Sequence, residues 1–193
     1  MLHVIYLHGF LSSPQSVKAQ QTAAFVKRHY PATNLHIPQL SGDIKAAVNT
    51  IEVIIASLPQ QPLKFIGSSM GGFLSTYFVE KYAHKNGAKA VLVNPAVTPH
   101  DLMQDYVGEH INPYSQERFY VTLASIEMMH RLNVLKPKYL HNYKVLLQTG
   151  DETLDYTVAQ AKYQGANLTV EQGGNHSFIG FEAHLPAIFA FLR

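Results

Sequence analysis

The chain has 193 residues, of which 47% are hydrophobic and 15% are charged, and its formal net charge is +2. This composition supplies enough apolar material for a core and excludes an intrinsically disordered protein, and the length suits one domain or one domain with an insert. The small net charge and the lack of a lysine or arginine run give no reason to expect a nucleic-acid partner, and the absence of cysteine excludes disulfides and thiolate metal sites.

The first residues, MLHVIYLHGFL, are apolar, but they lack the basic start of a signal peptide, carry two histidines and lead directly to a glycine. No stretch of the chain approaches the ~20 consecutive apolar residues that span a bilayer. We therefore expect a soluble, cytoplasmic protein with no membrane partner.

Six short apolar runs predict buried strands, in chain order at 2–8, 35–39, 63–68, 89–96, 144–150 and 167–172. Most of these runs are continuous rather than alternating, which is typical of parallel strands covered on both faces. The helical patterns between them include an apolar spacing over 44–58 with Asp43 as its cap, a stripe over 73–82, and a last helix over 178–192 whose start Pro186 leaves open. Strand alternating with helix predicts a parallel sheet with helices on both faces and the site at the carboxyl ends of its strands.

The stretch from 98 to 143 breaks this alternation. It contains three prolines, five tyrosines and no clear strand, and it is too long for an ordinary connection. We interpret it as a helical insert or lid within a single domain that spans 1–193.

The stretch Gly67-Ser68-Ser69-Met70-Gly71 matches the pattern G-x-S-x-G with Ser69 at its centre. In this motif the central serine lies on a sharp, strained turn between a strand and a helix, where side chains two residues before and after it would collide. A buried run precedes the match and an apolar helical stripe follows it, as the motif requires. The sequence therefore predicts Ser69 as a nucleophile and Gly67 and Gly71 as the elbow glycines; an ordinary turn of small residues is the alternative.

A serine hydroxyl needs a base to take its proton and a third group to orient that base. Around such an elbow the chain order is serine, acid and histidine, each on a loop that follows a strand. Asp151 comes directly after the run that ends at 150, and His176 lies in the loop after the last predicted strand. Asp155 is the alternative acid, and the unused one of the two would cap the following helix.

Two backbone amides are expected to form an oxyanion hole. The Met70 amide begins the helix after Ser69, and YLHGF closes the first strand much as HG-type motifs do in esterases, so the Phe10 amide is the natural second donor. His8 is then a structural hydrogen-bonding residue rather than a base. Neither His3 nor His8 has a spaced partner ligand, so no metal is expected.

Seven strings resemble those of the small bacterial esterases of the YqiA type, within the α/β-hydrolase superfamily. They run nearly end to end: YLHGFLSSP (6–14), IPQL (37–40), GSSMGG (67–72), NPAVTP (94–99), NPY (112–114), TGDETLDY (149–156) and GGNHSFIGFE (173–182). The resemblance implies a minimal α/β-hydrolase fold with about six strands, and a serine carboxylesterase without a cofactor that uses Ser69, Asp151 and His176. It leaves open the natural substrate and the choice between Asp151 and Asp155.

The resulting prediction is a serine esterase that cleaves small or medium acyl esters, or thioesters, through an acyl-enzyme. Its partner is a small-molecule substrate, and the sequence carries no signal for the oligomeric state. The insert is expected to supply the acyl pocket, with candidate wall residues Tyr106, Tyr114, Phe119 and Tyr120; for each of them, packing of the insert on the core is the alternative. A non-catalytic binding protein of the same fold, and a carbon–carbon hydrolase or cofactor-free haloperoxidase with the same triad, stay open.

Overall fold

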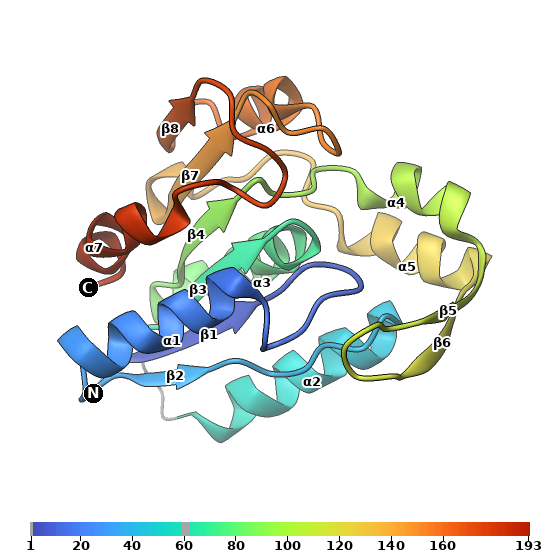
Figure 1. Cartoon of the computed structure of the whole chain (residues 1–193), viewed down its shortest axis with the longest axis horizontal. Coiled ribbons are helices and arrows are strands. Elements are labelled where there is room, and N and C mark those ends of the chain that lie inside the picture. The colour runs from blue at the N-terminus through green and yellow to red at the C-terminus, as the bar shows by residue number, and fades with distance from the viewer. Residues whose placement is uncertain (1, 59–61) are drawn as a thin grey trace.

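The computed structural model describes residues 2–58 and 62–193, apart from the side chains of 84–86. Figure 1 shows its elements, which in chain order are β1 (His3–Leu7), α1 (Val17–His29), β2 (Asn34–His36), α2 (Ile44–Ser57), β3 (Lys64–Ser68), α3 (Met70–Asn86), β4 (Lys89–Val93), α4 (Pro99–Leu102), the 3-10 helix η1 (Met103–Tyr106), β5 (Gly108–Ile111), β6 (Arg118–Val121), α5 (Leu123–Leu132), the 3-10 helix η2 (Leu140–Asn142), β7 (Tyr143–Gln148), α6 (Tyr156–Lys162), β8 (Asn167–Glu171) and α7 (Phe181–Leu192).

The six predicted strands form one parallel sheet in the order β2-β1-β3-β4-β7-β8. Along β1, Val4 and Tyr6 belong to one hydrophobic cluster and Ile5 and Leu7 to the other, and none of these four side chains is more than 1% exposed. Successive side chains of a strand point to opposite faces, so both faces of the sheet are covered. This double burial explains why the strands read as continuous apolar runs.

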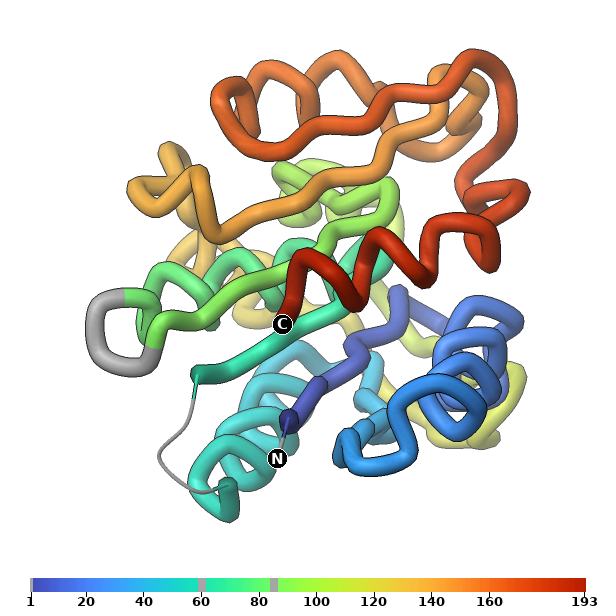
Figure 2. The backbone as a smooth tube through the Cα atoms, turned by 90° about the vertical axis from the view of Figure 1, so that its left-hand side faces the viewer, coloured from blue at the N-terminus to red at the C-terminus, as the bar shows by residue number. Residues whose placement is uncertain are grey.

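Two helical layers cover the sheet. Helices α1 and α7 pack together on one face, and α2, α3 and α6 contribute buried side chains to the cluster on the other. Figures 1 and 2 both place the start of β1 and the end of α7 at the same end of the sheet, where the parallel strands begin. The loops that follow β1, β3, β4, β7 and β8 therefore lie together at the opposite edge, where the parallel strands end.

Two helices differ from the sequence expectation in detail. Helix α1 is an addition to the helices expected from the sequence, although its buried residues Ala19, Thr22 and Val26 follow a spacing of three and four. Helix α7 begins at Phe181, after Gly180 with φ of 79°, and takes Pro186 into its interior. Asp43 caps α2 as predicted, because its side chain accepts a hydrogen bond from the Ala46 amide.

The expectation that 98–143 holds no strand is wrong. Strands β5 and β6 pair as an antiparallel hairpin between η1 and α5. In β6 the buried Phe119 and Val121 alternate with the exposed Arg118 and Tyr120, which is a strand pattern. Each strand has only four residues, too few for the alternation to be recognised in the sequence. The helical part of the prediction is confirmed by α4 and α5.

No helix in the described part of the chain is long and apolar enough to cross a bilayer.

Candidate active site

Ser69 lies on a sharp turn between β3 and α3. Its backbone angles are φ 54° and ψ −119°, a strained conformation for a residue with a side chain. A Cβ atom on Gly67 would lie 2.3 Å from the carbonyl oxygen of Gly71, and one on Gly71 would lie 1.9 Å from the carbonyl oxygen of Leu7. Only glycine fits at these two positions, which is the steric reason for the G-x-S-x-G spacing.

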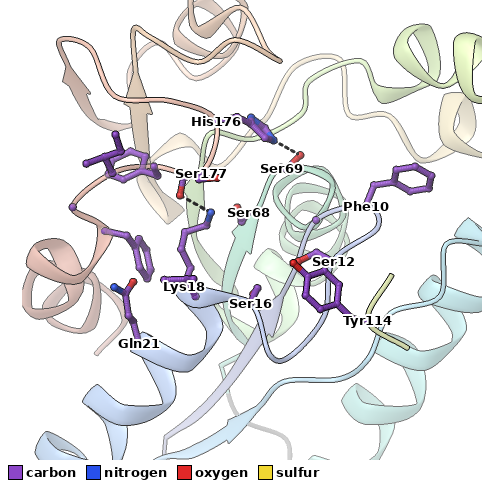
Figure 3. Close-up of a pocket in the computed structure, with 16 residues that line it drawn as sticks. Phe10, Ser12, Ser16, Lys18, Gln21, Ser68, Ser69, Tyr114, His176 and Ser177 are labelled. Carbon is purple, nitrogen blue, oxygen red and sulfur yellow. Dashed lines mark hydrogen bonds between the residues drawn. The ribbon is translucent and has the colours of Figure 1, made fainter. Parts of the chain in front are cut away.

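His176 reaches Ser69 from the loop after β8 (Figure 3). Its Nε2 lies 3.1 Å from the Ser69 Oγ, and its Nδ1 lies 2.9 Å from Oδ2 and 3.0 Å from Oδ1 of Asp151. With Nδ1 protonated, the ring donates to the carboxylate and its Nε2 accepts from the serine hydroxyl. The three side chains thus join into one chain of hydrogen bonds across 107 residues of sequence.

Asp151 is suited to hold the imidazole because its carboxylate is almost closed to solvent, at 2% exposed against 23% for His176. Burial by itself raises the pKa of Asp151, but hydrogen bonds from His176 and from the amides of Leu154 and Thr153 outweigh it, and the net pKa is lowered. The side chain is therefore ionised at neutral pH.

Asp155 does not contact the imidazole. Its Oδ1 accepts hydrogen bonds from the amide and the hydroxyl of Thr157, at 2.9 and 2.6 Å, and so caps α6. The sequence offers two candidate acids. In the structure Asp151 contacts His176, whereas Asp155 caps α6.

The loop after β1 forms the other wall beside the serine. A Cβ on Gly9 would lie 3.3 Å from the Ser69 Cβ, so the backbone of this loop runs close to the hydroxyl. His8 fixes the loop: its Nε2 accepts from the Leu40 amide at 3.0 Å, and its Nδ1 donates to the Gly9 carbonyl at 2.9 Å. Burial lowers the pKa of His8, although the Gly9 bond opposes this, so the ring is neutral and structural.

The two residues expected to supply the oxyanion donors both lie beside Ser69. Phe10 follows Gly9 and lines both cavities that border Ser69, and Met70 is the first residue of α3. The first amides of a helix have no partner within it, and the helix dipole favours negative charge at this end. The Met70 amide is thus available to an oxygen held beside Ser69.

Three further polar residues hold the His176 loop, and the sequence analysis did not assign them roles. The Asn94 side-chain amide donates to the carbonyls of Asn175 and His176, at 3.0 and 3.3 Å, and its Oδ1 accepts from the Gln148 amide at 3.0 Å. Glu152 accepts from the His176 amide at 2.9 Å. Asn94 and Gln148 end two buried apolar strands, and this position was the signal that could have revealed them.

Gln148 completes this clamp. Its Oε1 accepts from the amides of Asn175 and Ile179, at 3.1 and 2.9 Å, and its Nε2 donates to the Ile179 carbonyl at 2.7 Å. The histidine loop is therefore tied at both ends to the sheet edge rather than left as an open loop.

Two cavities meet at Ser69 and His176. The first, here called the Lys18 cavity, has a volume of about 440 Å³ and lies under the loop of His176 and the start of α1. The second, here called the insert cavity, has a volume of about 240 Å³; its apolar lining comes largely from the insert and its neighbours and includes Ala96, Pro99, Leu102, Met103 and Leu154. Ser69 thus lies between two cavities: one is lined in part by a lysine side chain, and the other has a mainly apolar lining.

Two of the four predicted wall residues line a cavity at Ser69, and two do not. Tyr106 lines the insert cavity and Tyr114 lines the Lys18 cavity. Phe119 and Tyr120 line neither of these two cavities. Phe119 is 5% exposed and packs edge-on against Phe10, with ring centroids 5.7 Å apart, while the Tyr120 hydroxyl lies 3.0 Å from the Glu109 carboxylate on the outside of the hairpin.

Among the described residues, no group of three or more His, Cys, Asp or Glu side chains is arranged to hold a metal ion. His3 stacks on His36 with ring centroids 5.7 Å apart, and His8 bridges backbone groups, so neither forms part of such a cluster.

Comparisons with known proteins agree with this architecture. The model of an uncharacterised protein family, UPF0227, matches residues 3–193. A UPF0227 protein of Shewanella woodyi is 23% identical over 192 residues, which cover 98% of this chain and 99% of the relative.

Two solved structures are similar over nearly the whole chain. Est1E from Butyrivibrio proteoclasticus, with ferulic acid bound, has a TM-score of 0.75 at 11% identity and covers 99% of this chain and 88% of its own. The alpha/beta hydrolase domain-containing protein 10 from mouse has a TM-score of 0.70 at 18% identity, covering 97% and 87%. At these identities the likeness concerns the fold, which is that of the α/β hydrolases.

Proposed function

The chain belongs to the uncharacterised protein family UPF0227, and from this premise and the geometry at Ser69 we propose that it is a serine carboxylesterase. The observation that carries the proposal is the hydrogen-bonded series from Ser69 Oγ to His176 Nε2 at 3.1 Å and from His176 Nδ1 to Asp151 at 2.9 Å. Nucleophile, base and orienting acid in this contact are what ester hydrolysis through an acyl-enzyme needs.

In the first half-reaction, the Ser69 oxygen attacks the ester carbonyl while His176 Nε2 takes the hydroxyl proton. Negative charge develops on the carbonyl oxygen, where the amides of Phe10 and Met70 donate hydrogen bonds. Asp151 accepts from Nδ1 and stabilises the imidazolium. As the tetrahedral intermediate collapses, Nε2 gives its proton to the departing alcohol, and the acyl group stays on Ser69.

In the second half-reaction, water takes the place of the alcohol. His176 removes one of its protons, the oxygen attacks the acyl-serine, and the acid leaves as the proton returns to Ser69. A thioester fits the same steps with a thiol as the leaving group.

The acyl chain lies in the insert cavity, because this cavity is small and its lining is apolar. Its volume of about 240 Å³ favours small or medium acyl chains. The alcohol side of the ester then lies in the Lys18 cavity, on the other side of Ser69.

The test is covalent labelling and hydrolysis on matched serine variants. A fluorophosphonate probe should label the wild-type protein and Ser68→Ala, but not Ser69→Ala, and p-nitrophenyl butyrate hydrolysis should be lost only in Ser69→Ala. A purely receptor-like protein would neither react nor hydrolyse. Labelling of Ser69 without cleavage of esters or thioesters, together with turnover of diketones or halide oxidation by peroxide, would instead assign the triad to carbon–carbon hydrolysis or haloperoxidation.

A further inference from the structure

Lys18 brings a positive charge into the cavity beside the nucleophile. It is the second residue of α1, and its Nζ donates to the Ser177 carbonyl at 2.8 Å, next to His176 (Figure 3). Of the sixteen residues that line the Lys18 cavity, none is aspartate or glutamate, and Lys18 alone carries a fixed charge. Within the described part of the chain, Lys18 forms no ion pair.

The positive charge of Lys18 is destabilised by its partial burial in the cavity. Burial lowers the pKa of Lys18 to about 8, and the negative charge of Asp151 acts in the opposite direction. The ammonium is thus mostly protonated at pH 7, but it has lost water without gaining a carboxylate in contact. An ammonium group has three N–H donors, and one of them is used by Ser177. Two donors are left for a ligand in the cavity.

The start of α1 adds to the positive potential. Ser16, Val17 and Lys18, the cap and first two residues of this thirteen-residue helix, all line the cavity. The first turn holds no acidic residue, and the Ser16 side chain makes no capping bond. The unpaired amides of a first turn favour an anion, so they and Lys18 act on the same space.

We propose that the leaving group of the ester substrate carries an acidic substituent, a carboxylate or a phosphate, which binds Lys18 in the Lys18 cavity. This inference rests on the proposed function, since it names the substrate class of the same site. The reaction itself is unchanged: the acyl C–O bond breaks, water supplies the hydroxyl of the acid product, and the alcohol leaves with its proton and its anionic group. Lys18 acts on recognition rather than on the chemical step.

The test compares butyrate esters of three alcohols at pH 7, with acid release followed by titration. The alcohols are 4-hydroxybutanoate, its uncharged isostere 4-methylpentan-1-ol, and 3-hydroxypropyl phosphate. The wild-type enzyme should show a kcat/KM at least tenfold higher for an anionic ester than for the neutral one. The two anionic arms then distinguish a carboxylate from a phosphate as the preferred group.

Variants of Lys18 separate binding from loop support. Lys18→Met should reduce the ratio of kcat/KM for the anionic ester to kcat/KM for the neutral ester to near one, mainly through a higher KM for the anionic ester. Lys18→Arg should keep much of the preference, because it keeps the charge. The control Lys27→Met makes the same substitution on the exposed last turn of α1 and should behave as wild type.

Each other outcome counts against the inference. If the neutral and anionic esters are cleaved equally by the wild-type enzyme, the inference fails while the proposed function stands. If Lys18→Met slows all three esters to the same degree, Lys18 only supports the Ser177 loop and the inference is overturned. If no ester is cleaved and Ser69 resists the fluorophosphonate, the proposed function has failed and the inference falls with it.

Discussion

The sheet edge and the insert meet at the same site but are built in different ways. Ser69, Asp151 and His176 each follow a strand of the parallel sheet, and their loops are tied by hydrogen bonds at about 3 Å. The insert reaches the site with Tyr106 and Tyr114, which are 42% and 58% exposed. One region is fixed by the sheet, and the other lies over it from outside.

The contacts that hold the two regions differ accordingly. The hairpin of the insert is fastened near its turn, where the Asn112 side-chain amide donates to the Ser12 carbonyl at 3.0 Å and Ser41 donates to Glu117. Farther along the hairpin, Glu109 pairs with Arg118 in a solvent-exposed ion pair, a kind that contributes little to stability. We therefore expect substitutions at the sheet edge to change the rate of the chemical step, and substitutions in the insert to change which acyl chain is preferred.

Removal of the base gives the largest expected effect. His176→Ala should lower kcat for p-nitrophenyl butyrate by about 10⁴-fold or more, because both half-reactions need a proton acceptor at Nε2. Circular dichroism should show that the variant still melts cooperatively, so that the loss of kcat reports the missing base rather than unfolding. A kcat within tenfold of the wild type would remove His176 from the mechanism.

The two acids of the sequence motif offer a matched pair. Asp151→Asn should lower kcat by about 10³–10⁴-fold, because an amide does not hold the imidazole in the required tautomer. Asp155→Asn should leave kcat within threefold, and asparagine caps a helix about as well as aspartate, so the free energy of unfolding should also change little. Steady-state kinetics and urea unfolding of both variants give the comparison, and similar activity losses in the two would contradict the assignment of Asp151.

Most of the site at the sheet edge could be predicted from the sequence, because the constraints on its residues are local. Glycine is required at 67 and 71 because a Cβ at either position would lie less than 2.5 Å from a backbone oxygen, and the strands read as apolar runs because both their faces are buried. The choice between Asp151 and Asp155 could not be made from the sequence. Both residues follow the same strand, β7, and only the fold determines which of them contacts His176.

Other features escaped the sequence because they depend on distant partners. Asn94 and Gln148 act by hydrogen bonding to a loop that lies far along the chain. In the sequence Lys18 is one of fifteen lysines and arginines, and only the fold places it in the cavity beside Ser69. Phe119 was a reasonable wall residue by composition, but its burial against Phe10 is a tertiary contact.

Asn94 tests whether the fixed geometry of the sheet edge matters for the rate. Asn94→Ala removes the donors to the carbonyls of residues 175 and 176 and leaves the Gln148 amide without its acceptor. We expect kcat to fall by about 10–100-fold with KM nearly unchanged, as for other residues that orient a reacting group through hydrogen bonds. A loss of stability without this loss of kcat, measured by urea unfolding beside the kinetics, would mean that the clamp serves the fold alone.

The smallest expected effect lies in the insert. Leu102 lines the insert cavity and is 39% exposed, so Leu102→Ala should leave the chemical step intact while it removes apolar contacts to the acyl chain. We expect kcat/KM for butyrate esters to fall by about threefold to tenfold and the optimum to shift toward longer chains that fill the space. Leu123→Ala is the control, because Leu123 belongs to the insert, is 71% exposed and lines neither cavity at Ser69. If both variants keep the wild-type profile across p-nitrophenyl acetate, butyrate and octanoate, the acyl chain lies elsewhere; the insert would then cover the site without selecting its substrate.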